Sequence, residues 1–189
     1  MKGLRLALFV ASLAFASHAF GLEPAGVAAT TGTIEYAFTP GNDAAGLIVR
    51  TIDAASTQVL VQAFSFTHRD IADALIRAHR RGLDVQVIAD REQSDSLEST
   101  AMQSLIDAGV PLLLDAEHSA AHNKVVIIDS GTRQPVLITG SFNFTFAAQY
   151  RNAENVLVLR GNPELAQAFF ENWIRHREHS VVSGRKHSR

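Results

Sequence analysis

The stretch His122-Asn123-Lys124-Val125-Val126-Ile127-Ile128-Asp129 says most about the fold and chemistry of this chain. Residues 124–128 predict a strand. Side chains alternate along a strand, so His122 and Lys124 point to the same face, whereas Asp129 has the opposite parity at the strand's end. The stretch therefore predicts a nucleophile or general acid beside a fixed positive charge. The carboxylate is better placed to fix a turn or a neighbouring element.

Two later stretches supply complementary groups. In Gly140-Ser141-Phe142-Asn143, the serine and the asparagine are again two residues apart, just beyond a predicted strand. Both side chains offer hydrogen-bond donors, which can stabilise the charge that develops in phosphoryl transfer. Glu154 opens the following strand and can accept a hydrogen bond from a ring nitrogen of His122, which would fix the tautomer and stabilise the imidazolium.

The pattern around these stretches predicts strands that alternate with helices. The predicted strands are 34–38, 58–64, 83–89, 110–114, 124–128, 136–139 and 155–159, and the predicted helices are 44–54, 68–81, 97–108 and 163–177. We expect one domain over residues 34–180, an α/β/α sandwich with a mixed β-sheet. The sequence contains no internal repeat.

The two ends of the chain differ from this domain. Residues 1–19 combine Lys2 and Arg5 with an apolar run too short to span a bilayer, and small residues follow at the cleavage positions. This predicts a signal peptide, a periplasmic or secreted protein and no integral membrane segment after cleavage. An uncleaved anchor or a buried strand is disfavoured because no charged stop-transfer segment follows. Residues 20–33 predict a linker and residues 181–189 a basic tail.

Composition narrows the chemistry. The chain has 189 residues and no cysteine, which excludes thiolate nucleophiles and thiolate metal ligands. The formal charge of −2 becomes −4 when Lys2 and Arg5 are removed with residues 1–19. Since most nonspecific nucleic-acid binders are basic, this is a mild argument against a nuclease, although a local basic cleft can exist on an acidic protein.

Together, His122-x-Lys124-x₄-Asp129, Gly140-Ser141-Phe142-Asn143 and the downstream Glu154 resemble the phospholipase D superfamily pattern, HxKx₄D followed by GSxN and an acid. The resemblance covers roughly the whole mature chain and is closest to the short secreted bacterial endonuclease type. It includes the opening strands, 36–40 and 61–66. It implies a phospholipase D/nuclease-like fold.

The resemblance also implies a mechanism with no metal and no cofactor. The motif histidine, here His122, attacks phosphorus and forms a phosphohistidine, while a second motif histidine protonates the leaving oxygen and then activates water. Lys124 and Asn143 bind the nonbridging oxygens with help from Ser141, and Glu154 orients His122. The candidate catalytic set is His122, Lys124, Asp129 and Glu154, of which Asp129 is expected to lie further from phosphate.

This mechanism needs two motif histidines, and the chain has one, since no other histidine is followed two residues later by lysine. We therefore predict a homodimer with its active site at the two-fold interface.

Several other residues have plainer interpretations. His118 lies four residues before His122, but the segment leads into a strand and lacks a third ligand in sequence, so a solvated or substrate-lining loop residue is favoured over a metal ligand. Asp90-Arg91-Glu92 predicts a loop rather than an acid/base pair. Arg151 and Arg160 fit a phosphate-binding cleft and solvated surface equally well. Exposed helical positions are expected for His68, His79, His176 and His179, and core positions for Phe142, Phe144 and Phe146.

Three functions fit this chemistry. The first is a nonspecific endonuclease acting on DNA, with RNA left open as a further substrate. The second is a phospholipase D that hydrolyses phosphatidyl lipids to phosphatidate. The negative net charge favours it mildly, as does the cluster of Phe142, Phe144 and Phe146, which could stack on an acyl chain if these residues are not in the core. The third is a catalytically idle nucleic-acid-binding module, which the intact set of His122, Lys124, Asn143 and Glu154 argues against.

Overall fold

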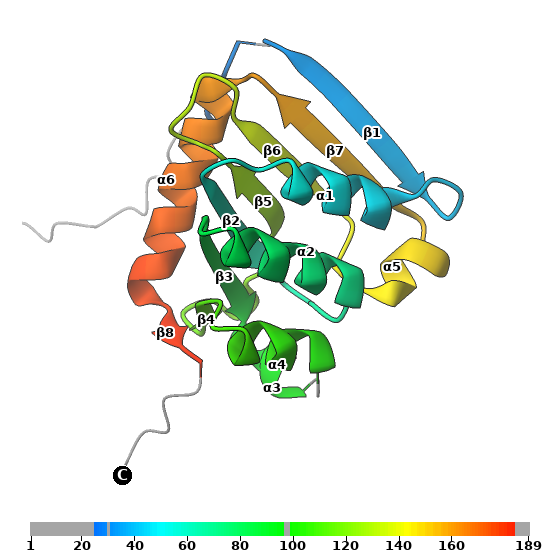
Figure 1. The fold of residues 1–189 in the computed structure, drawn as a ribbon, viewed down its shortest axis with the longest axis vertical. Helices are drawn as coiled ribbons and strands as arrows, with labels where there is room; N and C mark the ends of the chain where they lie inside the picture. Colours follow the sequence, from blue (N-terminus) through cyan, green and yellow to red (C-terminus); the bar gives the residue numbers. More distant parts are fainter. Residues whose placement is uncertain (1–24, 30, 97–98, 184–189) are drawn as a thin grey trace, which may run out of the picture.

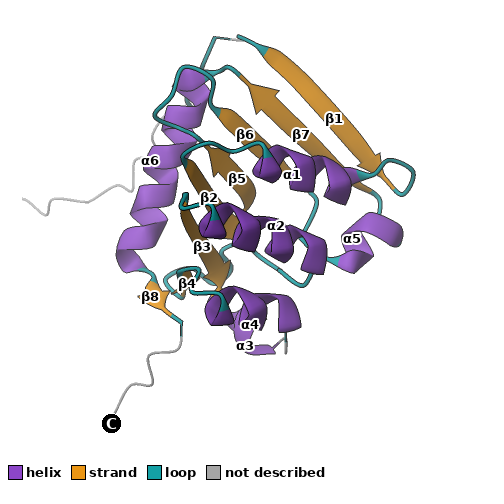
Figure 2. Cartoon of the chain, in the orientation of Figure 1, coloured by secondary structure: helices purple, strands orange, loops and turns teal. Residues whose placement is uncertain are grey.

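A computed structural model describes residues 25–29, 31–96 and 99–183, coloured along the sequence in Figure 1 and by secondary structure in Figure 2. The predicted signal peptide, 1–19, lies outside the described residues. The helices are α1 (Ala44–Asp53), α2 (Arg69–Arg80), α3 (Arg91–Ser96), α4 (Thr100–Asp107), α5 (Phe146–Tyr150) and α6 (Pro163–His179). The strands are β1 (Thr33–Thr39), β2 (Gln58–Ala63), β3 (Asp84–Asp90), β4 (Leu112–Asp115), β5 (Lys124–Ile128), β6 (Val136–Gly140), β7 (Glu154–Arg160) and β8 (Val181–Val182).

In the described part of the chain, the eight strands form one mixed sheet with the order β1-β7-β6-β5-β2-β3-β4-β8. Strands β2, β3 and β4 are parallel, and the remaining neighbours pair antiparallel. Helices α2 and α4 make the right-handed type of crossover that parallel neighbours require. The predicted α/β class with a mixed sheet is confirmed.

Both faces of the sheet are covered. Helices α1 and α2 lie in front of the sheet in Figure 1 and pack, with α4, on the larger core, which includes Val126 and Ile128 of β5. Val125 and Ile127, of opposite parity, join a second core with Trp173 of α6. The Trp173 indole donates to the carbonyl of Val61 at 3.1 Å, which fixes α6 on β2. A strand buried on both faces needs an unbroken apolar run, and β5 has one.

The strand directions place the motif residues. Strands β5 and β7 run in the direction opposite to β1, β2, β3, β4 and β6. The N-terminal ends of β5 and β7 therefore lie at the same edge of the sheet as the C-terminal ends of those five strands. We call this edge the His122 edge. The ends of β3 and β4, Asp90 and Asp115, also lie on it.

Some local predictions were incomplete. The helix predicted over 97–108 is observed as α4, preceded by the separate helix α3, and α5 was not predicted. Residues 181–182, assigned to the basic tail, form β8, whose valines pair with Leu113 and Leu114 of β4. The rest of that tail, 184–189, lies outside the described residues. Among the helices described, none is both long and apolar enough to cross a membrane.

Candidate active site

His122 and Lys124 lie together on the His122 edge, as strand parity predicts. Lys124 Nζ is 3.0 Å from His122 Nδ1 and donates to the His122 carbonyl oxygen at 2.9 Å. The lysine is buried, whereas the histidine is exposed. The arrangement presents an imidazole to solvent with a cation held beneath it.

Phe64, which the sequence analysis did not single out, is the third member of this group. Its ring centroid lies 4.3 Å from that of His122 and 4.8 Å from Lys124 Nζ. The register accounts for this position, because Ala63 is paired with Lys124 and the Phe64 amide donates to Asn123. The aromatic face stabilises the ammonium and limits the positions open to the imidazole.

The environment of Lys124 changes its acidity. Burial lowers the pKa of Lys124 to about 8, and the nearby Glu154 carboxylate opposes this effect. A pKa near 8 still leaves the side chain mostly protonated at neutral pH, so the cation is present where an anionic phosphate would bind. The charge is lost as the pH rises above that value.

Ser141 is held by its neighbour on β7. Its Oγ accepts hydrogen bonds from the backbone N and the side-chain Nδ2 of Asn155, at 3.0 and 3.3 Å. This leaves the hydroxyl proton of Ser141 as a donor. Gly140 makes the approach possible, since a Cβ there would collide with the Asn155 carbonyl oxygen and its φ of 149° disfavours other residues. The glycine of the motif is therefore a steric requirement.

Asn143 carries a polar atom that the fold does not satisfy. Its Oδ1 is buried and has no hydrogen-bond partner among the described residues. The adjacent backbone is well fixed, because the Phe144 carbonyl accepts from the amides of Thr67 and His68 at 2.9 Å. Buried amide oxygens usually have partners, so this unpartnered oxygen marks Asn143 as a candidate ligand-binding residue. Oδ1 only accepts, so a phosphate oxygen would have to bind the Nδ2 of the same side chain.

Glu154 starts β7 opposite Thr39 of β1. Its Oε1 accepts from Asn152 Nδ2 at 3.0 Å, and its charge acts on Lys124. Within the described residues no hydrogen bond joins it to His122, whose Nδ1 faces Lys124 instead. Orientation of His122 by Glu154 therefore stays a prediction.

Asp129 lies at the opposite edge of the sheet. Its carboxylate accepts from the backbone amides of Ser56, Thr57 and Gln58 at 2.7–2.9 Å, and from the Thr57 hydroxyl at 2.8 Å. Burial raises the pKa of Asp129, but these hydrogen bonds outweigh burial and lower it overall. Asp129 fixes the segment that enters β2, as its parity suggested, and it does not lie beside His122.

The predicted exposure of several histidines was wrong. His68 is buried, with neither ring nitrogen hydrogen-bonded to a described residue, and His79 is half-buried. Burial lowers the pKa of His68 below its ordinary value, although Asp70 and Asp43 oppose this. His176 and His179 are partly buried, because α6 turns its last residues toward β4. Their environment is described below.

The other plain interpretations had mixed outcomes. Asp90 is the last residue of β3, and its carboxylate accepts from the amides of Gln93 and Ala121, so it is not half of an acid/base pair. Arg160, at the far end of β7, bonds Glu35 and does not reach the His122 edge. Arg151 is exposed. Of the three phenylalanines assigned to the core, Phe142 and Phe144 are buried and Phe146 is 56% exposed.

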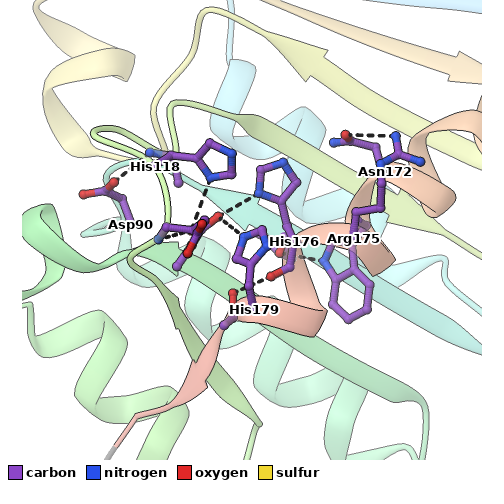
Figure 3. A network of polar contacts seen from close by, with 12 residues as sticks. Asp90, His118, Asn172, Arg175, His176 and His179 are labelled. Carbon is purple, nitrogen blue, oxygen red and sulfur yellow. Dashed lines mark hydrogen bonds and ion pairs between the residues drawn. The ribbon is translucent and has the colours of Figure 1, made fainter. Parts of the chain in front are cut away.

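A second polar cluster lies on the same edge. Asp115 is buried and is surrounded by His118, His176 and His179. Figure 3 shows the three histidine side chains lying close together. One partner of His118, Asp115, lies three residues before it in sequence, but the other two come from a distant part of the chain, since Asp115 and His176 are 61 residues apart. Burial alone would raise the pKa of Asp115, but the adjacent His176 and His179 outweigh it and lower the pKa to about 2.

The arrangement of an α/β/α sheet with a histidine and a lysine at the start of a central strand is that of a phosphodiesterase domain. A family model described as "Cardiolipin synthase, PLD-like domain" matches residues 48–176. This chain belongs to the phospholipase D superfamily and is a phosphodiesterase of that superfamily.

Three similar proteins bear on the substrate. A phospholipase D from Rickettsia felis is 38% identical over 144 residues, covering 75% of this chain and 68% of the relative. A mitochondrial cardiolipin hydrolase from Chlamydomonas reinhardtii is 31% identical over 140 residues, covering 71% of this chain and 57% of the relative. The structure of the phospholipase D family member Nuc from Salmonella typhimurium has a TM-score of 0.74 and 34% identity, covering 79% of this chain and 97% of that chain.

Proposed function

We propose that the chain is an exported endonuclease that cleaves DNA, with RNA as an open alternative substrate, through a covalent intermediate on His122 and without a metal in the reaction. The observation that carries the proposal is the contact between His122 and the buried Lys124 on the His122 edge, with Ser141 and Asn143 on the segment that follows the neighbouring strand β6. The resemblance to the short secreted endonuclease type supports the substrate. The match to nearly the whole of the Nuc chain supports a unit of this size.

The proposed reaction proceeds in two displacements. A ring nitrogen of His122 attacks phosphorus, a P–N bond forms, the P–O bond to the leaving group breaks, and a second histidine gives that oxygen a proton. Water then attacks phosphorus, loses a proton to the second histidine, and releases His122. Lys124 and Asn143 would hold the nonbridging oxygens, with the Ser141 hydroxyl as a further donor. Glu154 would orient the nucleophile.

The contact with Lys124 also bears on which of the two histidines is the nucleophile and which is the proton donor. A lysine ammonium only donates, so the 3.0 Å contact uses the lone pair of His122 Nδ1 and leaves the proton on Nε2. That tautomer suits a proton donor. A nucleophilic Nε2 needs its proton on Nδ1 instead, held by an acceptor such as Glu154. The mechanism thus requires two copies of His122 in different states.

We propose a two-fold homodimer that supplies the second copy, so that His122 of the partner subunit faces the same phosphate. The chain has a single His-x-Lys motif, and its histidine is exposed. Two exposed aromatic pairs lie on elements next to β7: Tyr36–Phe38 on β1, which pairs with β7, and Phe146–Tyr150 on α5, which precedes β7 in the chain. Apolar side chains grouped beside an incomplete site favour burial against a second chain. Sedimentation of the active enzyme tests this, and a strictly monomeric active species would contradict it.

Phospholipid hydrolysis is the second candidate. It is favoured by the same exposed aromatic side chains, which suit acyl chains, and by the name of the Rickettsia relative. The chemistry at phosphorus is identical, so the site does not discriminate between the two substrates.

The deciding experiment offers the purified chain plasmid DNA and, separately, phosphatidylcholine vesicles, both in excess EDTA. Cleavage of DNA that persists in EDTA and disappears in His122→Ala supports the nuclease, with His79→Ala as the control for folding and purity. Headgroup release without DNA cleavage would replace the substrate. Inactivity on both would favour a binding module, and loss of activity in EDTA, with the circular dichroism spectrum and the midpoint of thermal unfolding unchanged, would overturn the metal-free mechanism.

A further inference from the structure

The Asp115 cluster has no part in the proposed reaction. Asp115 Oδ2 lies 2.7 Å from His176 Nδ1 and 3.2 Å from His179 Nε2, and its Oδ1 lies 3.5 Å from His118 Nδ1. The three imidazole centroids are 5.0–5.3 Å apart. The Asp115 side chain is fully buried, whereas the rings are 15–48% exposed. A carboxylate is thus enclosed by three imidazoles at the protein surface.

The fold brings these residues together from three places. Asp115 ends β4 and His118 lies on the segment that follows. His176 and His179 are three residues apart in the last turn of α6, so their side chains share one face of the helix. Strand β8 then pairs with β4, which holds the end of α6 against this strand. The positions depend on backbone elements, not on the cluster itself.

The donor set matches a particular kind of ion. Imidazole nitrogen and carboxylate oxygen bind Zn²⁺ at about 2.0–2.2 Å, so the edges of a tetrahedral site are about 3.3 Å. One ligand atom from each of the four residues can be chosen so that all lie within 4.8 Å of one another. Small side-chain rotations would bring them to bonding distance. His179 Nε2 is itself buried without a hydrogen bond, despite its approach to Asp115.

We propose that Asp115, His118, His176 and His179 bind one divalent transition-metal ion of the zinc type. Four protein ligands complete a tetrahedron and leave no position for water or substrate, which is typical of structural rather than catalytic sites. The ion would join α6 to the end of β4 and to the segment that leads to His122. This inference does not depend on the proposed nuclease activity.

A route for the ion is present. A cavity of about 550 Å³ opens beside the cluster and is lined by Asp115 and His118. Its other walls include Asp90, Glu92 and Asp95, opposed by the single cation Arg91. A mostly acidic entrance raises the local concentration of cations.

Metal content and affinity test the proposal directly. The untagged full chain, stripped with EDTA and dialysed, is titrated with Zn²⁺ by calorimetry and with Co²⁺ by visible absorption. We expect one equivalent of each ion, a tetrahedral Co²⁺ spectrum and a higher midpoint of thermal unfolding with Zn²⁺. A folded chain that binds neither ion would overturn the proposal, leaving three imidazoles that only surround the Asp115 carboxylate.

Variants locate the site. His118→Ala removes an exposed side chain, so it should fold normally and weaken Zn²⁺ binding at least about 100-fold, and His176→Ala should do the same. His79→Ala, on α2 and outside the cluster, should bind Zn²⁺ as the unmodified chain does. Undiminished binding in both His118→Ala and His176→Ala, with folding checked by circular dichroism, would place the metal elsewhere and contradict the proposal.

Discussion

The site at His122 and the site at His118 lie at the same edge of the sheet, and they differ in the charge of the buried residue beside the imidazole. At His122 the neighbour is a buried ammonium, Lys124, and the ring faces solvent. At His118 the neighbour is a buried carboxylate, Asp115, and two further imidazoles close around it. A cation prepares the first group for an anionic phosphate, and an anion prepares the second for a metal ion. His118 and His122 are only four residues apart, yet their surroundings favour ligands of opposite charge, because the buried group beside the ring is an anion in one case and a cation in the other.

The largest expected effect comes from His122→Ala, which removes the proposed nucleophile. Phosphodiester cleavage should fall by at least about 10⁴-fold, the scale seen when a covalent catalyst loses its nucleophile. Initial rates on plasmid DNA and on vesicles measure it. Zn²⁺ affinity should be unchanged in the same variant. A parallel loss of metal binding would show that the two groups are one site.

Lys124→Met should reduce cleavage about 10²–10³-fold, since it removes one charged stabiliser of the transition state. It should also raise the midpoint of thermal unfolding, because burial already lowers the pKa of this lysine and so disfavours its charged form. Paired rate and melting measurements test both effects. A variant that is inactive and also less stable would mean that Lys124 serves the fold rather than the phosphate.

The pH dependence of kcat/KM should also report on Lys124, with a smaller effect than replacement of the side chain. The pKa of Lys124 is about 8, so kcat/KM should fall above that pH by up to about tenfold per unit as the charge is lost. Lys124→Arg is the matched control, because a guanidinium stays charged and its alkaline decline should disappear. A decline that persists in the arginine variant would assign it to another group.

Asp129→Asn should have the smallest effect on catalysis, because this motif residue lies on the opposite edge. Asparagine tolerates the φ of 52° found there, so the change tests the hydrogen bonds alone. We expect a loss of about 1–3 kcal/mol in the free energy of unfolding. The lowered pKa of Asp129 means that its contribution is present above the unfolded pKa and is lost as the pH falls. Denaturant titration measures both, and a large loss of rate in folded protein would return Asp129 to the active site.

Local chemistry made much of the first group predictable. Parity placed His122 with Lys124 and separated Asp129 from them, and the alternation of strands and helices predicted the sheet. Phe64 was not singled out, because its position depends on the register between β2 and β5, which are far apart in sequence.

The group of Asp115, His118, His176 and His179 was also not predictable, because it depends even more on contacts between residues far apart in sequence. His118 seemed to lack further ligands because two of its three partners, His176 and His179, come from the end of α6, and the two-residue strand β8 that holds this end gives no periodic signal. The exposure predicted for His176 and His179 followed from helical position alone. Tertiary packing decided it, because the last turn of α6 faces β4.

The pairing of β1 with β7 has a consequence for the order of folding. The two strands are paired from Thr33 with Arg160 to Thr39 with Glu154. β1, the first strand described, can therefore pair only after β7, which is close to the end of the chain, is available. Local units such as β2-α2-β3 close small loops, whereas this ladder closes the longest one, and the entropy cost rises with loop length. A growing chain therefore keeps β1 unpaired until β7 has been made. Glu154 belongs to that final ladder, and the active site is completed only when the whole sheet has formed.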